Sequence, residues 1–182
     1  MQFRHIAAVS LLALSSVHAL AADPTASLNK SFAEYTATGP VGNNNINTST
    51  FYWMKEQAGT WMGQQVQSWL LIWDPERSAQ VRGIVTFDAD ILHVLDSKAE
   101  LQATAAFEKP GVTYNYSRSA VGLENGEARN TSFTDATLSL RWTASNPGDH
   151  VRVMTAVPEP GTYALMAAGL AVLGFAARRR KG

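Results

Sequence analysis

The sequence predicts a mainly β fold over residues 22–156, an antiparallel β-sandwich or jelly roll. Three observations support this class: short runs of β-branched and aromatic residues, alternation of apolar and polar residues, and frequent breaks at Gly, Pro and Asn. Such strands are typical of two packed antiparallel sheets. The chain has no cysteine, so apolar burial rather than disulfides is expected to stabilise this single domain.

The first 21 residues are expected to form an N-terminal signal helix. Arg4 makes the start positive, residues 6–20 are mostly apolar, and Ala19 and Ala21 give the small-x-small pattern that signal peptidase recognises. We therefore expect export through the Sec translocon and cleavage by signal peptidase after Ala21. A buried N-terminal helix is the alternative interpretation.

Two tryptophans lie in a segment whose secondary structure is ambiguous. Residues 66–73 carry apolar side chains at spacings that fit both a helix and a strand. The run is short and ends at an Asp-Pro pair, which favours a strand. Four of the five tryptophans lie between positions 53 and 73, and core packing is the favoured role for them. The alternative is a platform for glycans that includes Trp69 and Trp73.

Three further segments are predicted strands. Residues 80–87 are rich in β-branched side chains, and residues 101–107 and 112–116 lie on either side of a Lys-Pro-Gly turn. Asp88 and Asp90 follow the first of these strands, with the i, i+2 spacing that places two side chains on one face. They could bind calcium or act as an acid–base pair, but they lack the glycine pattern of a calcium loop, so a solvated strand end or turn is favoured.

The end of the domain is predicted to be a β-hairpin. Apolar and polar residues alternate strictly over 136–143, and Asn-Pro-Gly-Asp at 146–149 then forms a turn. Val151 and Val153 lie on the predicted return strand. This hairpin would lead directly into the C-terminal segment.

Charge and motif content exclude several functions. Residues 22–157 contain ten basic and fourteen acidic residues with no Lys/Arg run, which argues against a nucleic-acid partner. His93 and His150 do not form a closely spaced metal-binding pair, and no cysteine supplements them. The sequence also lacks the nucleophile, phosphate-loop and dinucleotide motifs. We therefore expect no catalytic residues, no bound metal and no cofactor.

The C-terminal segment, residues 157–182, has three parts. Pro158, Glu159, Pro160 and Gly161 come first, and the prolines keep this stretch extended. A transmembrane helix is expected over about residues 162–177, although its uncharged core of 14 residues is shorter than the roughly 20 that span a bilayer comfortably. Tyr163 would lie at the outer interface, and a basic cluster at 178–181 would stay in the cytoplasm. The cluster consists of Arg178, Arg179, Arg180 and Lys181.

This order of motif, apolar segment and basic cluster resembles the PEP-CTERM sorting signal of exported Gram-negative bacterial proteins. The resemblance implies recognition and processing by a membrane protease, exosortase, near Pro158-Glu159-Pro160. It implies that the chain is held in the inner membrane, with its C-terminus cytoplasmic, and then reaches the cell surface or extracellular matrix. It also implies an association with exopolysaccharide and biofilm. The catalytic residues would belong to exosortase.

Three hypotheses for function follow. The first is a non-enzymatic surface or matrix protein sorted by exosortase. The second is a carbohydrate-binding β-sandwich that uses the tryptophan cluster. The third is a small secreted hydrolase built on Asp88 and Asp90.

Overall fold

The structure is a computed structural model that describes residues 21–145, 147–157 and 169. Strands predominate in these residues, which confirms the predicted mainly β class. The strands are β1 (Thr25–Leu28), β2 (Phe32–Glu34), β3 (Phe51–Trp61), β4 (Gln64–Trp73), β5 (Ala79–Thr86), β6 (Ile91–Leu95), β7 (Ser132–Thr134), β8 (Thr137–Ala144) and β9 (Asp149–Ala156). The helices are α1 (Lys98–Ala103) and α2 (Asn125–Ala128), with 3-10 turns η1 (Ala105–Phe107) and η2 (Ser119–Val121).

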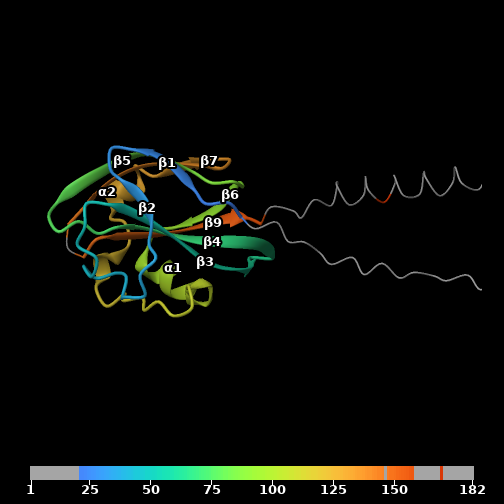
Figure 1. Cartoon of the computed structure of the whole chain (residues 1–182), viewed down its shortest axis with the longest axis horizontal. Helices are drawn as coiled ribbons and strands as arrows, with labels where there is room; N and C mark the ends of the chain where they lie inside the picture. Colours follow the sequence, from blue (N-terminus) through green and yellow to red (C-terminus); the bar gives the residue numbers. More distant parts are fainter. Residues whose placement is uncertain (1–20, 146, 158–168, 170–182) are drawn as a thin grey trace, which may run out of the picture. The chain divides into compact units, whose positions relative to one another are not determined.

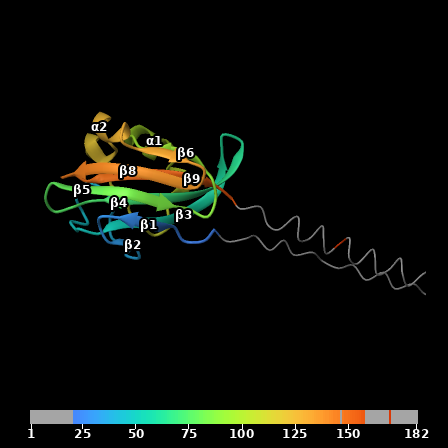
Figure 2. The same ribbon diagram turned by 90° about the horizontal axis from the view of Figure 1, so that it is seen from above.

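The strands form two sheets. One has the order β1-β5-β8-β7, and the other has the order β2-β3-β4-β9-β6. All pairings are antiparallel except that of β2 with β3, which is parallel, so the prediction of purely antiparallel sheets needs this correction. Figure 1 shows β1, β5 and β7 in one layer and β3, β4 and β9 in the other, and Figure 2 shows β1, β3, β4, β5 and β9 from above.

The main core lies between the two sheets. It contains side chains of β3, β4 and β9 from one sheet and of β5 and β8 from the other. Aromatic rings fill much of it: Phe51 packs against Trp142, and Trp69 packs against Phe87, with ring centroids 5.3 and 5.9 Å apart. Large rings suit this space because each buries much apolar area when two sheets pack face to face.

Strand β4 explains the ambiguity of residues 66–73. The segment is a strand, as favoured, and every residue from Val66 to Trp73 is buried. Trp69 and Leu71 point into the core between the sheets, whereas Leu70 and Ile72 belong to a second cluster on the opposite face. Because both faces are covered, buried side chains occur at every position from 66 to 73, and their spacing fits either periodicity.

Helix α1 covers part of this second face (Figure 1), and Leu101 of α1 is buried there with Met54 of β3. The strand predicted at 101–107 is therefore wrong: the segment forms the end of α1 and the turn η1. The cause is a capping box, in which the Ser97 side chain accepts from Glu100 N and the Glu100 side chain accepts from Ser97 N. These caps favour a helix despite the apolar residues that follow.

Two other predictions fail because strand pairing depends on distant residues. Residues 112–116 form no strand; Tyr114 makes only an isolated bridge with Val41. Residues 137–144 and 149–156 are both strands, as predicted, but they do not form a hairpin. Strand β8 pairs with β5 and β7, whereas β9 pairs with β4 and β6 in the other sheet.

A buried ion pair links β9 to β3 and α1. The Arg152 guanidinium donates to both carboxylate oxygens of Glu56, at 2.6 and 2.8 Å, and both side chains are fully buried. Its remaining nitrogen donates to the backbone carbonyls of Leu101 and Thr104 at 2.9 and 3.0 Å. Ser68 Oγ donates to Glu56 Oε2 at 2.6 Å. The ion pair and its hydrogen bonds thus satisfy buried polar groups of β3, β4, β9 and α1.

Candidate functional site

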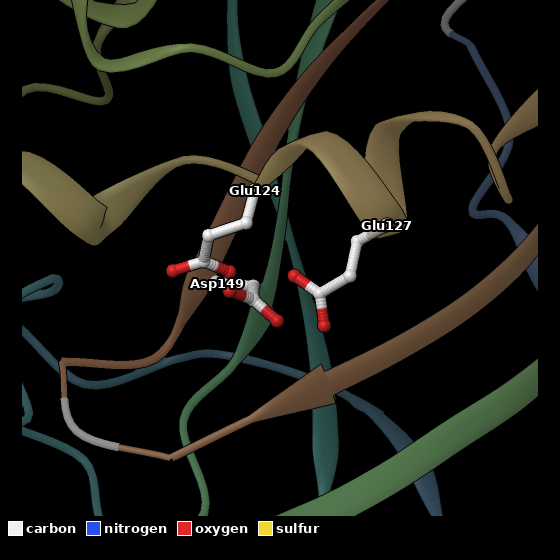
Figure 3. A group of neighbouring side chains, drawn as sticks. All are labelled: Glu124, Glu127 and Asp149. Carbon is white, nitrogen blue, oxygen red and sulfur yellow. The ribbon is translucent and has the colours of Figure 1, made fainter.

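Three carboxylates meet at one end of the domain. Glu124 is the residue before α2, Glu127 lies within α2, and Asp149 is the first residue of β9. One oxygen of each lies within 4.8 Å of the others. Figure 3 shows both glutamates extending from the same side of α2 toward Asp149. Residues far apart in the sequence thus form one acidic group, called here the acidic cluster.

The members of the acidic cluster differ in burial and in hydrogen bonding. Asp149 is only 2% exposed, and its Oδ2 is buried without a hydrogen-bond partner among the described residues. Glu127 Oε1 accepts from Thr143 N, whereas Glu127 Oε2 is buried and also lacks a described partner. Glu124 is exposed. At its buried end the cluster therefore has carboxylate oxygens without a hydrogen-bond donor, and at Glu124 it is open to solvent.

Burial of like charges perturbs the acidic cluster strongly. Burial raises the pKa of Asp149 to about 8, and the nearby charges of Glu127, Glu124 and Asp74 add to this effect. Burial also raises the pKa of Glu127, although the hydrogen bond from Thr143 N partly offsets it. Without a cation, Asp149 is therefore largely protonated at neutral pH.

The turn before Asp149 is fixed by Asp74. Gly148 has φ +81°, and a Cβ at this position would lie 2.6 Å from Asp74 Oδ1, so only glycine fits. Asp74 is 1% exposed and its Oδ2 accepts from Ile46 N at 2.9 Å. On the other side of this turn, Asn44 N donates to Pro147 O at 2.9 Å. Packing therefore holds the backbone that carries Asp149 in place.

The pKa of Asp149 predicts a pH-dependent loss of stability in metal-free buffer. Its folded pKa of about 8 lies above the ordinary value of 3.8, so between these values the folded state binds one more proton than the unfolded chain. The contribution of Asp149 to the free energy of unfolding is therefore fully present below about pH 4 and is lost as the pH rises through 8. We expect a loss of about 1.4 kcal/mol per pH unit over this window.

The measurement is urea unfolding of wild type and Asp149→Asn in EDTA, from pH 5 to 9. The difference in unfolding free energy should fall with pH up to about 8 and then level off. Burial lowers the pKa of His150 to about 4, which opposes the Asp149 slope at low pH, but this contribution cancels in the subtraction. A difference that is flat across the range would contradict the prediction.

The C-terminal segment supplies the evidence for the sorting route of this protein. Residues 156–181 match a protein-family model described as the PEP-CTERM protein-sorting motif. The chain carries a PEP-CTERM sorting motif. This confirms the resemblance found in the sequence, and the motif indicates exosortase-dependent sorting of an exported protein, with membrane anchoring before processing. Searches of curated proteins and of solved structures gave no match.

The PEP-CTERM motif includes every residue predicted to direct sorting or anchoring. Apart from residues 156 and 157, and the isolated residue 169, it lies outside the described residues. The motif residues Pro158, Glu159, Pro160 and Gly161 and the anchors Tyr163, Arg178, Arg179, Arg180 and Lys181 therefore stay sequence predictions. Among the residues that the structure describes, no helix is long and apolar enough to cross a membrane. The helix expected at about 162–177 is not among them, apart from residue 169.

Ala19 also lies outside the described residues, but Ala21 and Ala22 lie against the folded domain. Ala21 is 8% exposed, and its carbonyl accepts from Lys55 Nζ at 2.6 Å. Ala22 N donates to Asp88 Oδ2 at 2.5 Å. Cleavage after Ala21 would convert this N–H into an ammonium group beside a carboxylate. The cleavage position itself stays a prediction.

The predicted Asp pair lies away from the acidic cluster. Asp88 and Asp90 are exposed in the bend between β5 and β6, and neither belongs to the group of three carboxylates. This placement agrees with the interpretation of a solvated turn. Trp69 and Trp73 have no exposed surface, because both rings pack in the core between the sheets. Neither ring can present a face to a sugar while the core stays closed.

Sequence reasoning missed the acidic cluster completely. Asp149 appeared only as a turn residue, and Glu124 and Glu127 carry no motif. The available signal was weak: an acidic pair at i, i+3 that would lie on one face of a helix turn. Its partner in β9 is more than twenty residues further along the chain, so only the fold brings the three together.

Proposed function

We propose that this chain is a non-enzymatic surface or extracellular-matrix protein, delivered by exosortase and associated with exopolysaccharide. The observation that carries the proposal is the position of the PEP-CTERM motif. Strand β9 ends at Ala156, and the motif begins at residue 156. The sequence therefore joins the β domain to the sorting motif without a linker. Such an arrangement suits a chain whose folded domain is the material to be delivered.

The hydrolase alternative gains no support from the positions of Asp88 and Asp90. A surface depression of about 460 Å³ is lined by residues of the β4–β5 connection and the loop before β3, among them Asn47, Glu76 and Arg77. Neither Asp88 nor Asp90, the residues considered above as an acid–base pair, lines this depression. The tryptophans proposed for glycan contact are buried, which leaves the carbohydrate-binding alternative without exposed rings at those positions. Retention by exopolysaccharide would then use surfaces of the domain other than these two rings.

The topology follows from the same proposal. Before processing, the segment at about 162–177 would hold the chain in the inner membrane, with the basic cluster at 178–181 in the cytoplasm. Exosortase would then act near Pro158-Glu159-Pro160 and release the domain for transfer to the surface. The short apolar core fits a temporary anchor rather than a permanent one.

Replacement of Pro158-Glu159-Pro160 by three alanines tests this proposal in the native host. Intact-mass analysis should show that wild-type surface protein lacks the residues downstream of the motif, whereas the variant stays in the inner membrane with its full tail. Pro110→Ala is a matched control, because Pro110 is an exposed proline outside the motif. In a host without exosortase, the wild-type protein should likewise stay in the inner membrane with its full tail. Full-length protein at the surface of the wild type would contradict the proposal.

The matrix association needs a separate measurement. Extracellular polysaccharide from the wild-type host should retain the processed domain through washing, and a host that makes no exopolysaccharide should release the domain into the medium. Equal retention in the two hosts would refute the association while leaving the sorting route intact.

A further inference from the structure

We propose that Glu124, Glu127 and Asp149 bind one divalent cation, and that this cation is calcium. The proposal concerns the folded domain and goes beyond its sorting. It depends on the mutual position of the three carboxylates and on the unused oxygens at the base of the cluster. Close acidic groups are common on protein surfaces, and the buried oxygens without a donor distinguish this cluster from them.

The buried aspartate supplies that observation. Asp149 is only 2% exposed, and its carboxylate lies toward both glutamates (Figure 3). Its Oδ2 has no hydrogen-bond partner among the described residues. A buried carboxylate oxygen without a donor is costly, and most buried polar atoms in proteins are paired. Glu127 Oε2, in the same cluster, is also buried and lacks a donor among the described residues. A cation would satisfy both oxygens at once.

The donor set selects the metal. All three ligands are carboxylate oxygens, which suit hard cations, whereas zinc sites usually include histidine or cysteine. Calcium lies about 2.3–2.6 Å from its oxygens, so one ion can bridge oxygens up to about 5 Å apart. The spacing of up to 4.8 Å in the cluster fits this reach. Magnesium usually keeps several waters and binds through one or two carboxylates, so a set of three carboxylates suits it less well than calcium.

The open side of the cluster completes the site. Glu124 is exposed, so an ion can enter from solvent and keep waters in its remaining coordination positions. Glu127 Oε1 keeps its hydrogen bond from Thr143 N, and Oε2, which has no described donor, stays available to an ion. Bound calcium would therefore join α2 to β9, in the five-stranded sheet, and through Thr143 to β8, in the four-stranded sheet. Its role would be to stabilise the contact of α2 with both sheets outside the cell.

The test uses the purified full chain in mild detergent, stripped of metal by EDTA and then titrated with calcium. Extracellular calcium modules have dissociation constants of about 10⁻⁴–10⁻³ M, and we expect this range by calorimetry. At 10 mM calcium, the melting temperature should rise by about 5 °C over that in EDTA. A melting temperature that is the same in calcium and EDTA would refute the site.

Asp149→Asn and Glu127→Gln are the decisive variants. Each keeps the shape of the side chain, and each should abolish the calcium-dependent rise in melting temperature. In EDTA, Asp149→Asn should melt at or above the wild-type temperature, because the amide cannot ionise at this buried position and carries N–H groups that can donate to a neighbouring carboxylate. This second measurement shows that the variant is folded. Asp90→Asn is the matched control, because Asp90 is exposed in a turn, and it should keep the full rise.

The remaining outcomes separate the metals and the two proposals. Magnesium at the same concentration should give less than half the rise seen with calcium; an equal effect of magnesium, or a larger effect of zinc, would overturn the assignment to calcium. A calcium-dependent rise that persists in Asp149→Asn would overturn the site. None of these results depends on exosortase, so failure here would leave the sorting proposal unaffected.

Discussion

Arg152→Met is expected to lower the free energy of unfolding by about 3–5 kcal/mol. The substitution keeps most of the side-chain volume but removes both hydrogen bonds to the Glu56 carboxylate. Glu56 would remain buried with Ser68 Oγ as a donor, and the carbonyls of Leu101 and Thr104 would each lose the hydrogen bond from Arg152. Native domains are stable by only about 5–15 kcal/mol, so this loss should move the urea midpoint far down.

A double variant separates the charge effect from the packing effect. Glu56→Leu with Arg152→Met removes both charges, and apolar pairs that replace buried ion pairs are often neutral or stabilising. We therefore expect the double variant to recover most of the stability lost in Arg152→Met. Arg141→Met is the surface control, because Arg141 is exposed on β8, and it should change stability by less than about 0.5 kcal/mol. A loss below about 1 kcal/mol in Arg152→Met would show that Glu56 is not held buried.

The sequence predicts the strands of this fold where one face of the strand is buried and the other is exposed. Strand β8 alternates strictly between buried and exposed residues, and its pattern is visible without the structure. Strand β9 is buried along almost its whole length, so the order of its residues does not indicate which strand it pairs with. Proximity in sequence favoured a β8–β9 hairpin, but the two strands lie in different sheets. Strand pairing depends on side chains elsewhere in the chain, which local patterns do not describe.

The same limit applies to the acidic cluster. A strong local signal, the PEP-CTERM motif, identified the route of the protein because all its parts are contiguous. The cluster joins a short helix to a strand start, and the isolated pair Asp88 and Asp90 looked more like a site than Glu127 or Asp149 did. Burial decides between them: the first pair is exposed, whereas Asp149 is almost fully buried. Burial of a carboxylate is a property of the fold and has no local sequence signature.

Trp69→Ala is the second substitution with a large expected effect, about 3–5 kcal/mol of unfolding free energy. The ring has no exposed surface and lies between Trp53 and Phe87, each at 5.9 Å between centroids. Its Nε1 donates to Thr155 Oγ1 at 3.1 Å, so the substitution leaves a cavity and also removes the donor of a buried hydroxyl. Urea unfolding followed by circular dichroism measures the loss.

Trp61→Ala is the matched control for Trp69→Ala. Trp61 lies at the end of β3, is only half-buried, and packs edge-on against Phe107, so less contact area is lost and the cost should be clearly smaller. Equal costs at the two positions would contradict the placement of Trp69 in the core. The comparison also bears on glycan binding: if Trp69→Ala weakens the fold, then loss of polysaccharide binding in that variant is no evidence of an aromatic platform. A sugar site would have to be sought with substitutions that leave the urea midpoint unchanged.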